Sequence, residues 1–262
     1  GTTTKTVNVG FTDNLTLTTT PAIDTTVCAN APVPLVATAT TGASYSWTPI
    51  TGLSSATVSN PTASVGSNTS YTVTATLNGC VRNKTIPIKI KPNPIVSAGP
   101  AKTIIIGDEA TLEGSGAGGS IVWTPATSII SGGTTYTPIV RPSTTTTYTL
   151  SVTDANSCNS KDNVLVTVLP YCVKPMGAFT PNNDGINDKW MATTSNICTN
   201  RVGVIVYNRY GSTVYSNDNY QNEWDGTYKG SVIPDGTYYY YAVYELINGK
   251  TISLSGDLTI IR

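Results

Sequence analysis

The side chains best able to do chemistry are concentrated in one short segment near the C-terminus, Asn182-Asn-Asp-Gly-Ile-Asn-Asp188. Side-chain oxygens on alternate positions around a glycine can wrap a hard cation, as the loops of calcium-binding proteins do. Asn182, Asp184 and Asp188 are therefore candidate Ca²⁺ ligands, although the closing bidentate Glu of an EF-hand is missing. The alternative is an Asx-turn loop, whose side chains accept hydrogen bonds from their own backbone. Both interpretations predict a structural loop, and no other cofactor is expected.

Groups for catalysis are scarce. The chain has no histidine, which removes the commonest general base and every Ser-His or Cys-His arrangement. Three carboxylates remain, Asp225, Asp235 and Asp257, from which the paired-carboxylate site of a glycosidase could be formed. Asp225 and Asp235 each stand directly before a glycine, so we interpret them as turn residues. The sequence therefore predicts a protein that is not an enzyme.

Aromatic side chains are the other candidate ligand-binding groups. If exposed, they could stack on sugar rings as in a carbohydrate-binding module; the candidates are Trp190, Tyr210, Trp224 and Tyr239. For the two tryptophans the alternative is core packing, because large aromatics anchor small β cores. In the run from Tyr238 to Tyr241, strand alternation sends successive side chains to opposite faces. One pair should lie in the core and the other should be exposed or covered by a partner.

Composition restricts the fold and the partners. Only 11% of the 262 residues are charged and the net charge is zero, so there is no basic surface for nucleic acid. Thr, Ser, Gly and Pro are abundant, and short alternating runs of Val, Ile and Tyr favour strands joined by turns, hence an all-β fold. No apolar run approaches the roughly 20 residues that span a bilayer. The first residues resemble no signal peptide; Thr6–Val9 reads instead as the closing strand of an earlier module, as expected for a fragment of a longer secreted protein.

An internal repeat organises the first two thirds of the chain. Trp47 and Trp123 lie 76 residues apart (123 − 47 = 76), Tyr71 and Tyr148 lie 77 apart (148 − 71 = 77), and Cys80 and Cys158 lie 78 apart (158 − 80 = 78). Short β runs between Gly, Pro, Asn and Ser turns predict a β-sandwich for each copy. Brief Pro-containing linkers separate the expected modules: the end of a preceding module in 1–20, immunoglobulin-like sandwiches in 21–92 and 93–170, and a last β-sandwich in 171–262.

The five cysteines indicate disulfides. Cys28, Trp47 and Cys80 resemble the order in immunoglobulin-like sandwiches, where a Trp packs over an inter-sheet bridge. A Cys28–Cys80 bond would close a loop of 52 residues (80 − 28 = 52), worth ~4 kcal/mol in the chain-entropy model. Cys158 is left over, either free or paired with an external cysteine. A local bridge is expected between Cys172 and Cys198.

Four ordered blocks occupy the last third of the chain: Phe179-Thr-Pro-Asn-Asn-Asp-Gly-Ile-Asn-Asp188, Val206-Tyr-Asn-Arg-Tyr-Gly211, Trp224-Asp-Gly-Thr-Tyr228 and Pro234-Asp-Gly-Thr-Tyr-Tyr-Tyr-Tyr241. They resemble the gliding-motility-associated C-terminal domain of Bacteroidota, the type B sorting domain of the type IX secretion system. The residues that carry the resemblance, with the terminal Arg262, are Phe179, Pro181, Asn182, Asp184, Gly185, Asn187, Asp188, Asn208, Arg209, Gly211, Trp224, Asp225, Gly226, Pro234, Asp235, Gly236 and Tyr238.

The resemblance implies a function in export. It predicts passage through the periplasm and the outer-membrane translocon, with a PorP/SprF-like outer-membrane β-barrel as a further partner, and a final location at the cell surface. The two sandwiches resemble the Ig-like or PKD-like repeats of large SprB-like gliding adhesins, where they would form a stalk. The alternative is a carbohydrate-binding or stalk region of a secreted polysaccharide-degrading enzyme.

Two features of this domain are candidate contacts for the export machinery. The planar fork of Arg209 can satisfy buried carbonyls or meet an acidic partner. The run Thr251 to Arg262 predicts a strand that reaches the last residue, and an unpaired edge there can be recognised by strand addition. The alternative for that run is an ordinary closing strand.

Overall fold

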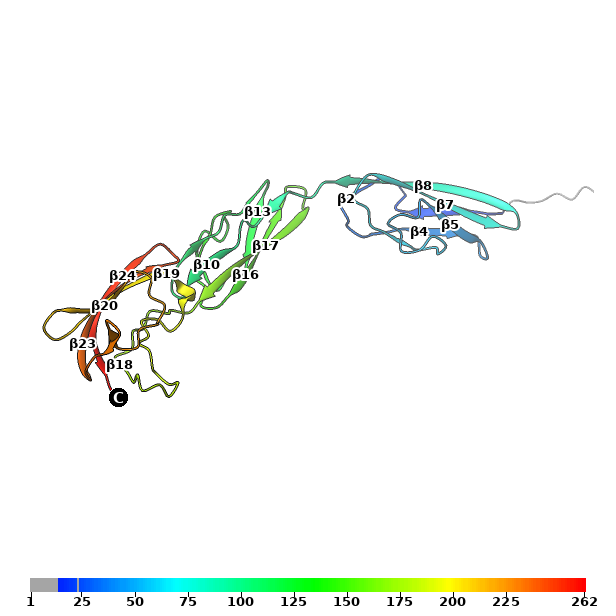
Figure 1. The fold of residues 1–262 in the computed structure, drawn as a ribbon. Coiled ribbons are helices and arrows are strands. Elements are labelled where there is room, and N and C mark those ends of the chain that lie inside the picture. The colour runs from blue at the N-terminus through cyan, green and yellow to red at the C-terminus, as the bar shows by residue number, and fades with distance from the viewer. Residues whose placement is uncertain (1–13, 23) are drawn as a thin grey trace, which may run out of the picture. The chain divides into compact units, whose positions relative to one another are not determined.

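The computed structural model describes residues 14–22 and 24–262, and it confirms an all-β fold built from sandwich-type sheets (Figure 1). Within this part of the chain the one helical element is the 3-10 turn η1, Asn196–Cys198. No helix in the described residues has the length and apolar character needed to cross a bilayer. The chain forms two compact units. The N-terminal unit comprises the described residues up to Val96 with Gly116–Ser120 and Ser151–Ser160, and the C-terminal unit comprises Ser97–Ser115, Ile121–Leu150 and Lys161–Arg262.

The N-terminal unit is built on a four-stranded sheet in the order β2-β8-β7-β5, with β2 parallel to β8 and the other pairs antiparallel. Two short ladders, β1-β4 and β3-β6, complete it. Trp47, Tyr71 and Leu35 are fully buried in its core. The strands are β1 Leu17–Thr20, β2 Thr25–Cys28, β3 Val33–Pro34, β4 Val36–Ala39, β5 Ser44–Thr48, β6 Thr62–Ala63, β7 Thr69–Leu77 and β8 Cys80–Lys91.

The N-terminal boundary of this unit differs from the prediction. β1 pairs with β4 from Leu17 opposite Ala39 to Thr20 opposite Val36, and Leu15 and Leu17 are buried in the same core. Residues 14–20 therefore belong to this unit and not to a preceding module, because their apolar side chains are buried here. The expected strand at Thr6–Val9 lies outside the described residues.

The predicted Cys28–Cys80 disulfide is wrong: Cys28 is bonded to Cys158, with 5.4 Å between their Cα atoms, and Cys80 is free. The strand order explains this. Cys28 lies opposite Lys91 at the end of β8, whereas Cys80 begins β8. Eleven residues at about 3.3 Å each place the two ends about 36 Å apart, far beyond the reach of a disulfide. Cys158, whose partner the sequence did not identify, is thus bonded to Cys28.

The sheets of residues 96–169 repeat the same plan, with β10 parallel to β17 in the order β10-β17-β16-β13, the order β11-β15-β14 in a second sheet, and a β9-β12 ladder. Trp123 and Tyr148 are buried at the positions that Trp47 and Tyr71 hold in the N-terminal unit. The strands are β9 Val96–Ser97, β10 Lys102–Ile105, β11 Ala110–Thr111, β12 Ser115–Gly116, β13 Ser120–Thr124, β14 Ile129–Ser131, β15 Ile139–Val140, β16 Thr146–Thr153 and β17 Asn159–Leu169.

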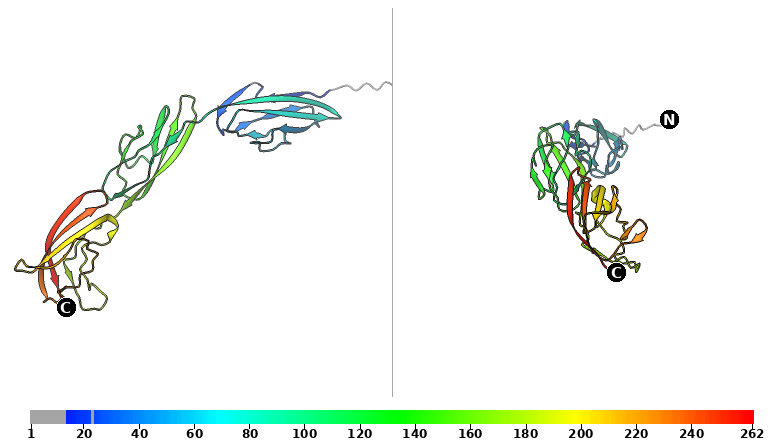
Figure 2. Two further views of the ribbon diagram at one scale, coloured as in Figure 1. Left: turned by 45° about the horizontal axis from the view of Figure 1, so that its top comes forward. Right: turned by 60° about the vertical axis from the view of Figure 1, so that its left-hand side comes forward.

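The last ninety residues form a five-stranded sheet in the order β18-β24-β23-β19-β20 and a small β21-β22 hairpin. The long hairpin β23-β24 (orange to red) is clear in Figure 2. β24 ends at Ile260, and there it pairs with β18 on one side and β23 on the other, so its C-terminal end offers no free edge. The strands are β18 Ala178–Phe179, β19 Thr199–Tyr207, β20 Thr213–Asn217, β21 Thr227–Tyr228, β22 Ser231–Val232, β23 Gly236–Leu246 and β24 Thr251–Ile260.

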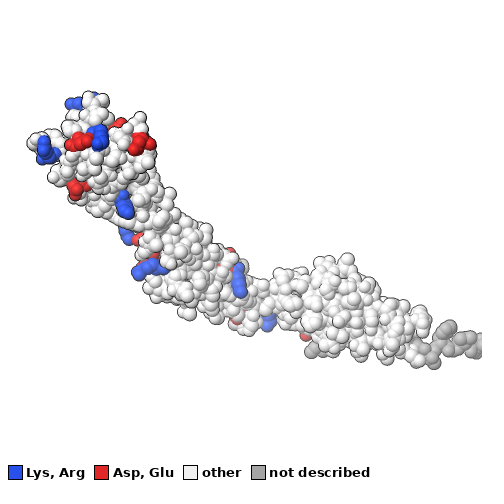
Figure 3. Space-filling model, turned by 90° about the horizontal axis from the view of Figure 1, so that it is seen from below, with Lys and Arg blue, Asp and Glu red and all other residues white. Residues whose placement is uncertain are grey.

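One face of this sheet is covered by the long connections before η1 and after β20, not by a second full sheet. Trp190, Tyr220 and Trp224 from these connections are buried against sheet residues such as Val204 and Tyr244. The expected Cys172–Cys198 disulfide is present and holds the first connection to the start of β19. On the surface drawn in Figure 3, charged side chains gather over the C-terminal end of the chain and are sparse over the N-terminal unit.

Candidate functional site

The motif blocks of the C-terminal unit meet at the end of the five-stranded sheet where the chain terminates. β18 runs parallel to the end of β24, with Phe179 opposite Ile260, and the Ile261 N–H donates to the Phe179 carbonyl at 3.2 Å. The Trp224 ring lies 5.6 Å from the Phe179 ring, centroid to centroid. The chain between the third and fourth blocks is held by the Ile233 N–H, which donates to the Gly226 carbonyl at 3.1 Å. We call this region the terminal site.

Arg262 joins these blocks. Its Nη1 donates to Asp235 Oδ1 at 2.6 Å and to the Ile233 carbonyl at 2.9 Å, and its Nη2 donates to the Gly226 carbonyl at 3.4 Å. Its backbone N–H donates to Asp235 Oδ2 at 3.1 Å. The Arg262 side chain is only 23% exposed. The last residue is therefore a structural part of the terminal site, in which one guanidinium fork satisfies a carboxylate and two carbonyls.

Gly226 is required where these groups converge. Its φ is +76°, a conformation that residues with a Cβ rarely adopt. A Cβ there would lie 3.2 Å from Arg262 Nη2 and 3.3 Å from both Ile260 Cδ1 and the Phe179 ring. Backbone conformation and close packing thus both explain the glycine of the Trp-Asp-Gly block.

The second motif block forms a tight turn beside the fourth. Asn208 Oδ1 accepts the backbone N–H groups of Tyr210 and Ser212, both at 3.0 Å, and Gly211 has a φ of +80°. Together the two blocks line a groove of about 230 Å³ formed by Asn208, Arg209, Tyr210, Pro234, Asp235, Gly236, Thr237 and Tyr238. The geometry of this turn therefore explains why Asn208 and Gly211 occur in the second block.

Arg209 has no such role. It is exposed, its guanidinium lies 5.2 Å from the centroid of the Tyr210 ring, and Tyr210 itself is 78% exposed. In the described residues the guanidinium that reaches backbone carbonyls in the terminal site is that of Arg262. The carbonyl-binding role that was one expectation for Arg209 thus belongs to Arg262, because Arg262 follows a buried strand while Arg209 lies at an exposed turn.

A second groove flanks Arg262 on the side of the first block. It has a volume of about 220 Å³ and is lined by Pro181, Asn183, Asp188, Lys189, Asp225, Thr227, Val232 and Arg262. The terminal site therefore has a groove on each side of the Arg262–Asp235 pair, and both grooves are formed largely by motif residues.

The Asn182–Asp188 loop has the hydrogen bonds of an Asx-turn loop. The two carboxylate oxygens of Asp188 accept the N–H groups of Asn183 at 2.6 Å and Gly185 at 2.7 Å. Asp184 Oδ1 accepts the Ile186 N–H at 2.8 Å, and Asn182 Oδ1 accepts the Asp184 N–H at 3.1 Å. Nowhere in residues 14–22 and 24–262 do three or more Asp, Glu, Cys or His side chains group so as to hold a metal ion. The loop geometry is thus accounted for without an ion.

The three candidate catalytic carboxylates are engaged separately. Asp225 Oδ1 accepts the N–H of Thr227 at 3.1 Å and its hydroxyl at 2.7 Å, as in a turn, and Asp235 pairs with Arg262. Asp257 lies on β24 opposite Tyr239. Two of the three therefore have structural roles.

The tryptophans are core residues, and sequence analysis missed the aromatic residues that connect them. Trp190 and Trp224 are 0% and 2% exposed, and their Nε1 atoms donate to the carbonyls of Met176 and Thr227. Tyr215 and Tyr220 bridge them with ring centroids 5.2 to 5.7 Å apart, and the Tyr220 hydroxyl donates to the Trp190 carbonyl. No motif marks these two tyrosines. Tyr215 lies on the covered face because β20 pairs with β19 in a register that sets Tyr215 opposite the buried Val206.

Several ionisable groups in and around this aromatic cluster have shifted pKa values. Burial, with a hydrogen bond to Glu223 at 2.6 Å, raises the pKa of Tyr215 to about 12. Burial also raises the pKa values of Tyr220 and Tyr244. For Glu223, burial favours a higher pKa, but the hydrogen bonds donated by Tyr215, Asn217 and the Gln221 N–H outweigh it and lower the pKa. The cluster is thus a neutral phenol network around one carboxylate that remains charged.

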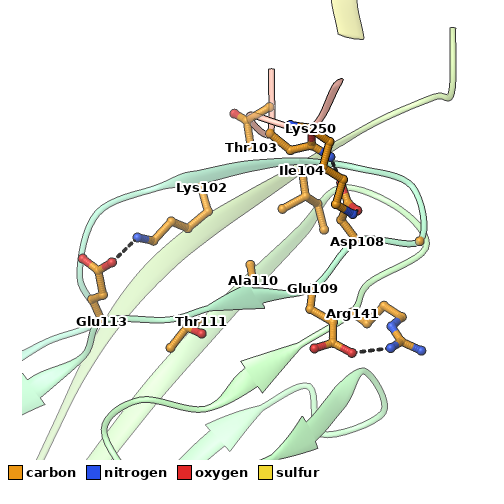
Figure 4. Close-up of a pocket in the computed structure, with 12 residues that line it drawn as sticks. Lys102, Thr103, Ile104, Asp108, Glu109, Ala110, Thr111, Glu113, Arg141 and Lys250 are labelled. Carbon is orange, nitrogen blue, oxygen red and sulfur yellow. Dashed lines mark hydrogen bonds and ion pairs between the residues drawn. The ribbon is translucent and has the colours of Figure 1, made fainter. Parts of the chain in front are cut away.

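A larger groove of the C-terminal unit lies elsewhere, between the edge strands β10 and β11 (Figure 4). It has a volume of about 670 Å³. Its charged side chains are engaged as three pairs, Lys102–Glu113, Arg141–Glu109 and Lys250–Asp108. Because each carboxylate already has a cationic partner, this groove has no excess charge to recognise an ion.

Comparison with known proteins finds one family that matches the C-terminal part of the chain. Residues 173–260 match the family model described as CHU_C Type IX secretion signal domain. The match covers the C-terminal sheet and the residues that form the terminal site, apart from Ile261 and Arg262. No curated protein sequence matches the chain.

Similar solved structures are multi-domain immunoglobulin proteins. An I-band fragment of titin, I67–I69, has a TM-score of 0.35 at 11% identity and covers 92% of this chain and 95% of its own. Sidekick-1 immunoglobulin domains 1–4 have a TM-score of 0.31 at 14% identity, and the match covers 92% of this chain and 74% of that one. Extracellular domains 3–5 of Drosophila OTK have a TM-score of 0.28 at 13% identity, and the match covers 96% of this chain and 99% of that one. Likeness this distant transfers no property to the chain.

Proposed function

We propose that residues 171–262 are the signal that takes this chain out of the cell through the type IX secretion system, and that the sandwiches of residues 21–92 and 93–170 are a stalk. The observation that carries the proposal is the match of residues 173–260 to a type IX secretion signal domain. The packing of the four motif blocks around one site supports it: Arg262 donates hydrogen bonds to the third and fourth blocks, it lines a groove with the first block, and the second block lines a groove with the fourth.

The mechanism is recognition of a folded surface, with no bond made or broken. Three of the motif residues have structural roles. Gly226 allows close packing, Asn208 accepts hydrogen bonds within its turn, and Asp188 accepts hydrogen bonds within its loop. Arg209 is exposed and makes no such contact, so we assign it to binding a partner. A planar, permanently charged fork stacked on an aromatic ring suits a carboxylate of the translocon or of a PorP/SprF-like outer-membrane β-barrel.

The full protein, in this proposal, is a gliding adhesin of the SprB-like type on the surface of a member of the Bacteroidota, exported via the periplasm. Pro-containing linkers between β-sandwiches stiffen a chain and hold an upstream region away from the cell. On the face drawn in Figure 3 the N-terminal unit has few charged side chains, which is compatible with a spacer.

Export of a reporter tests the signal. Residues 171–262 are fused to a periplasm-targeted fluorescent protein in a gliding Bacteroidota cell, and surface fluorescence is measured with and without them. Arg209→Ala should abolish most surface delivery while leaving thermal stability unchanged. Lys229→Ala is the matched control, because Lys229 is also exposed and lies 5.2 Å from a Tyr ring, that of Tyr228, but outside the motif positions. Equal delivery by both variants would reject the role of Arg209, and delivery without residues 171–262 would reject the proposal.

Carbohydrate binding is a second candidate function. Tyr239 and Tyr241 are 50% and 43% exposed on the outer face of β23, whereas Tyr238 and Tyr240 face the core. Exposed aromatic faces on a sheet can stack on sugar rings. Binding to a glycan array that is lost in Tyr239→Ala would favour this function, and no binding by the intact chain would remove it.

A further inference from the structure

The Cys28–Cys158 disulfide joins two successive sandwiches at defined positions. Cys28 is the last residue of β2, the parallel strand of the N-terminal unit, and lies opposite Lys91, after which the chain leaves for the next sandwich. Cys158 lies at the tip of the β16-β17 hairpin of that next sandwich, where Asp154 Oδ1 accepts its N–H at 2.8 Å. The end of one parallel strand therefore holds the hairpin tip of the following sandwich.

At the next junction, between the second sandwich and the C-terminal sheet, the equivalent positions are joined by apolar packing and hydrogen bonds in place of a disulfide. Ile105 is the last residue of the parallel strand β10, opposite Leu169, and so occupies the position of Cys28. It is 3% exposed and belongs to the apolar core of the C-terminal sheet. Just after it, Asp108 accepts hydrogen bonds from Asn248 at 2.6 Å and Lys250 at 2.7 Å. These two residues form the tip of the β23-β24 hairpin, so the strand end again holds the next hairpin tip.

Cys80 occupies the corresponding hairpin tip in the first sandwich. It follows the two-residue turn Asn78-Gly79 and lies opposite Leu77, and it aligns with Cys158 in the repeat. The other four of the five cysteines are in disulfides. Cys80 is partly buried, and its neighbour Val81 is 48% exposed, an apolar side chain at the surface of the tip. The tip thus has a free thiol beside an exposed apolar side chain, at the position where the tip of the next sandwich has its disulfide.

We propose that Cys80 forms a disulfide with a further sandwich of this type that precedes it along the chain, at a cysteine that ends a strand equivalent to β2. The evidence for the partner is the bonded Cys158, which has the same place in the repeat and takes a β2-end cysteine as its partner. The stalk would then be a series of covalently stapled sandwiches. This inference concerns the stalk, and it holds or fails independently of the export signal.

The reaction is an oxidation of two thiols. The Cys80 and partner thiols lose two protons and two electrons, and one S–S bond forms. The oxidant is the disulfide of a thiol–disulfide oxidoreductase, which accepts the electrons and leaves as a dithiol after a mixed-disulfide step. Such oxidation occurs in the bacterial periplasm.

Peptide mapping of the full-length protein, recovered from cells, alkylated and digested without reduction, tests the proposal. The expected result is a peptide containing Cys80 linked to a cysteine upstream of residue 1, with the Cys28–Cys158 pair also present as evidence of native folding. An alkylated Cys80 thiol beside an intact Cys28–Cys158 pair would overturn the proposal. So would a Cys80–Cys80 link between two chains.

An extended chain gives a second test. A copy of residues 14–96 is placed ahead of Asn14 of the full chain, so that the added Cys28 precedes the original Cys80. Oxidative refolding should protect the added Cys28 from maleimide, and Cys80→Ser in the original sandwich should restore its labelling. Labelling of the added Cys28 in both chains, with Cys28–Cys158 formed in the original part, would contradict the proposed partner.

Discussion

The sharpest test of the terminal site compares two glycines that share a backbone conformation but not a neighbourhood. Gly226 has a φ of +76° and Gly230 a φ of +78°, four residues apart in the same segment. A Cβ on Gly226 would meet Arg262, Ile260 and Phe179 at 3.2 to 3.3 Å, whereas a Cβ on Gly230 would meet nothing within 4 Å. The pair Gly226→Ala and Gly230→Ala therefore separates backbone strain from packing.

The expected magnitudes follow from these two contributions. A left-handed conformation costs an alanine roughly 1–2 kcal/mol, and this cost should apply to both variants. Overpacking costs a further ~1–3 kcal/mol at a well-packed position, and this cost should apply to Gly226→Ala alone. We expect the free energy of opening the terminal site to fall by about 1–2 kcal/mol in Gly230→Ala and by about 2–5 kcal/mol in Gly226→Ala.

Hydrogen exchange measured by mass spectrometry suits this comparison, because it resolves peptides covering 224–262 within the full chain. A difference of about 1.4 kcal/mol corresponds to tenfold faster exchange. Peptides of the N-terminal unit serve as the internal reference and should not change. Equal protection in the two variants would refute the argument that the motif blocks pack closely on Gly226.

Three further predictions concern the same unit. Arg262→Ala and Asp235→Asn should show a coupling free energy of about 0.5–1 kcal/mol in a double-mutant cycle of unfolding; additive effects would deny their pairing. Because the pKa of Tyr215 rises from 10.0 to about 12 on folding, its protonated phenol favours the folded state below pH 10, and this contribution is lost as the pH rises towards 12. Tyr215→Phe should therefore flatten the fall in stability over that range, and an unchanged slope would contradict this. Since Asp188 accepts two backbone N–H groups, chelation of calcium should leave the unfolding midpoint unchanged, while Asp188→Ala should cost about 1–3 kcal/mol; a lower midpoint in chelator would instead establish an ion.

Much of the local structure was predictable because it depends on neighbouring residues. The alternation in Tyr238–Tyr241 gave two faces, and the structure buries Tyr238 and exposes Tyr239. The Asn248-Gly249 turn joins β23 to β24 as its sequence predicts. Repeated Trp and Tyr positions identified duplicated sandwiches, and Trp47 and Trp123 are buried in both. These signals depend on spacing over a few residues or on a constant offset along the chain.

The relations between distant segments were decided by the tertiary structure. The five cysteines alone allow several pairings, and the parallel β2-β8 pair excludes Cys28–Cys80 by placing the two residues at opposite ends of β8. The sequence alone likewise identified the four motif blocks, but not that Arg262 bonds to two of them or that Arg209 stays exposed. Strand order and register place side chains in space, and they depend on the burial of the whole core, which no short stretch of sequence specifies.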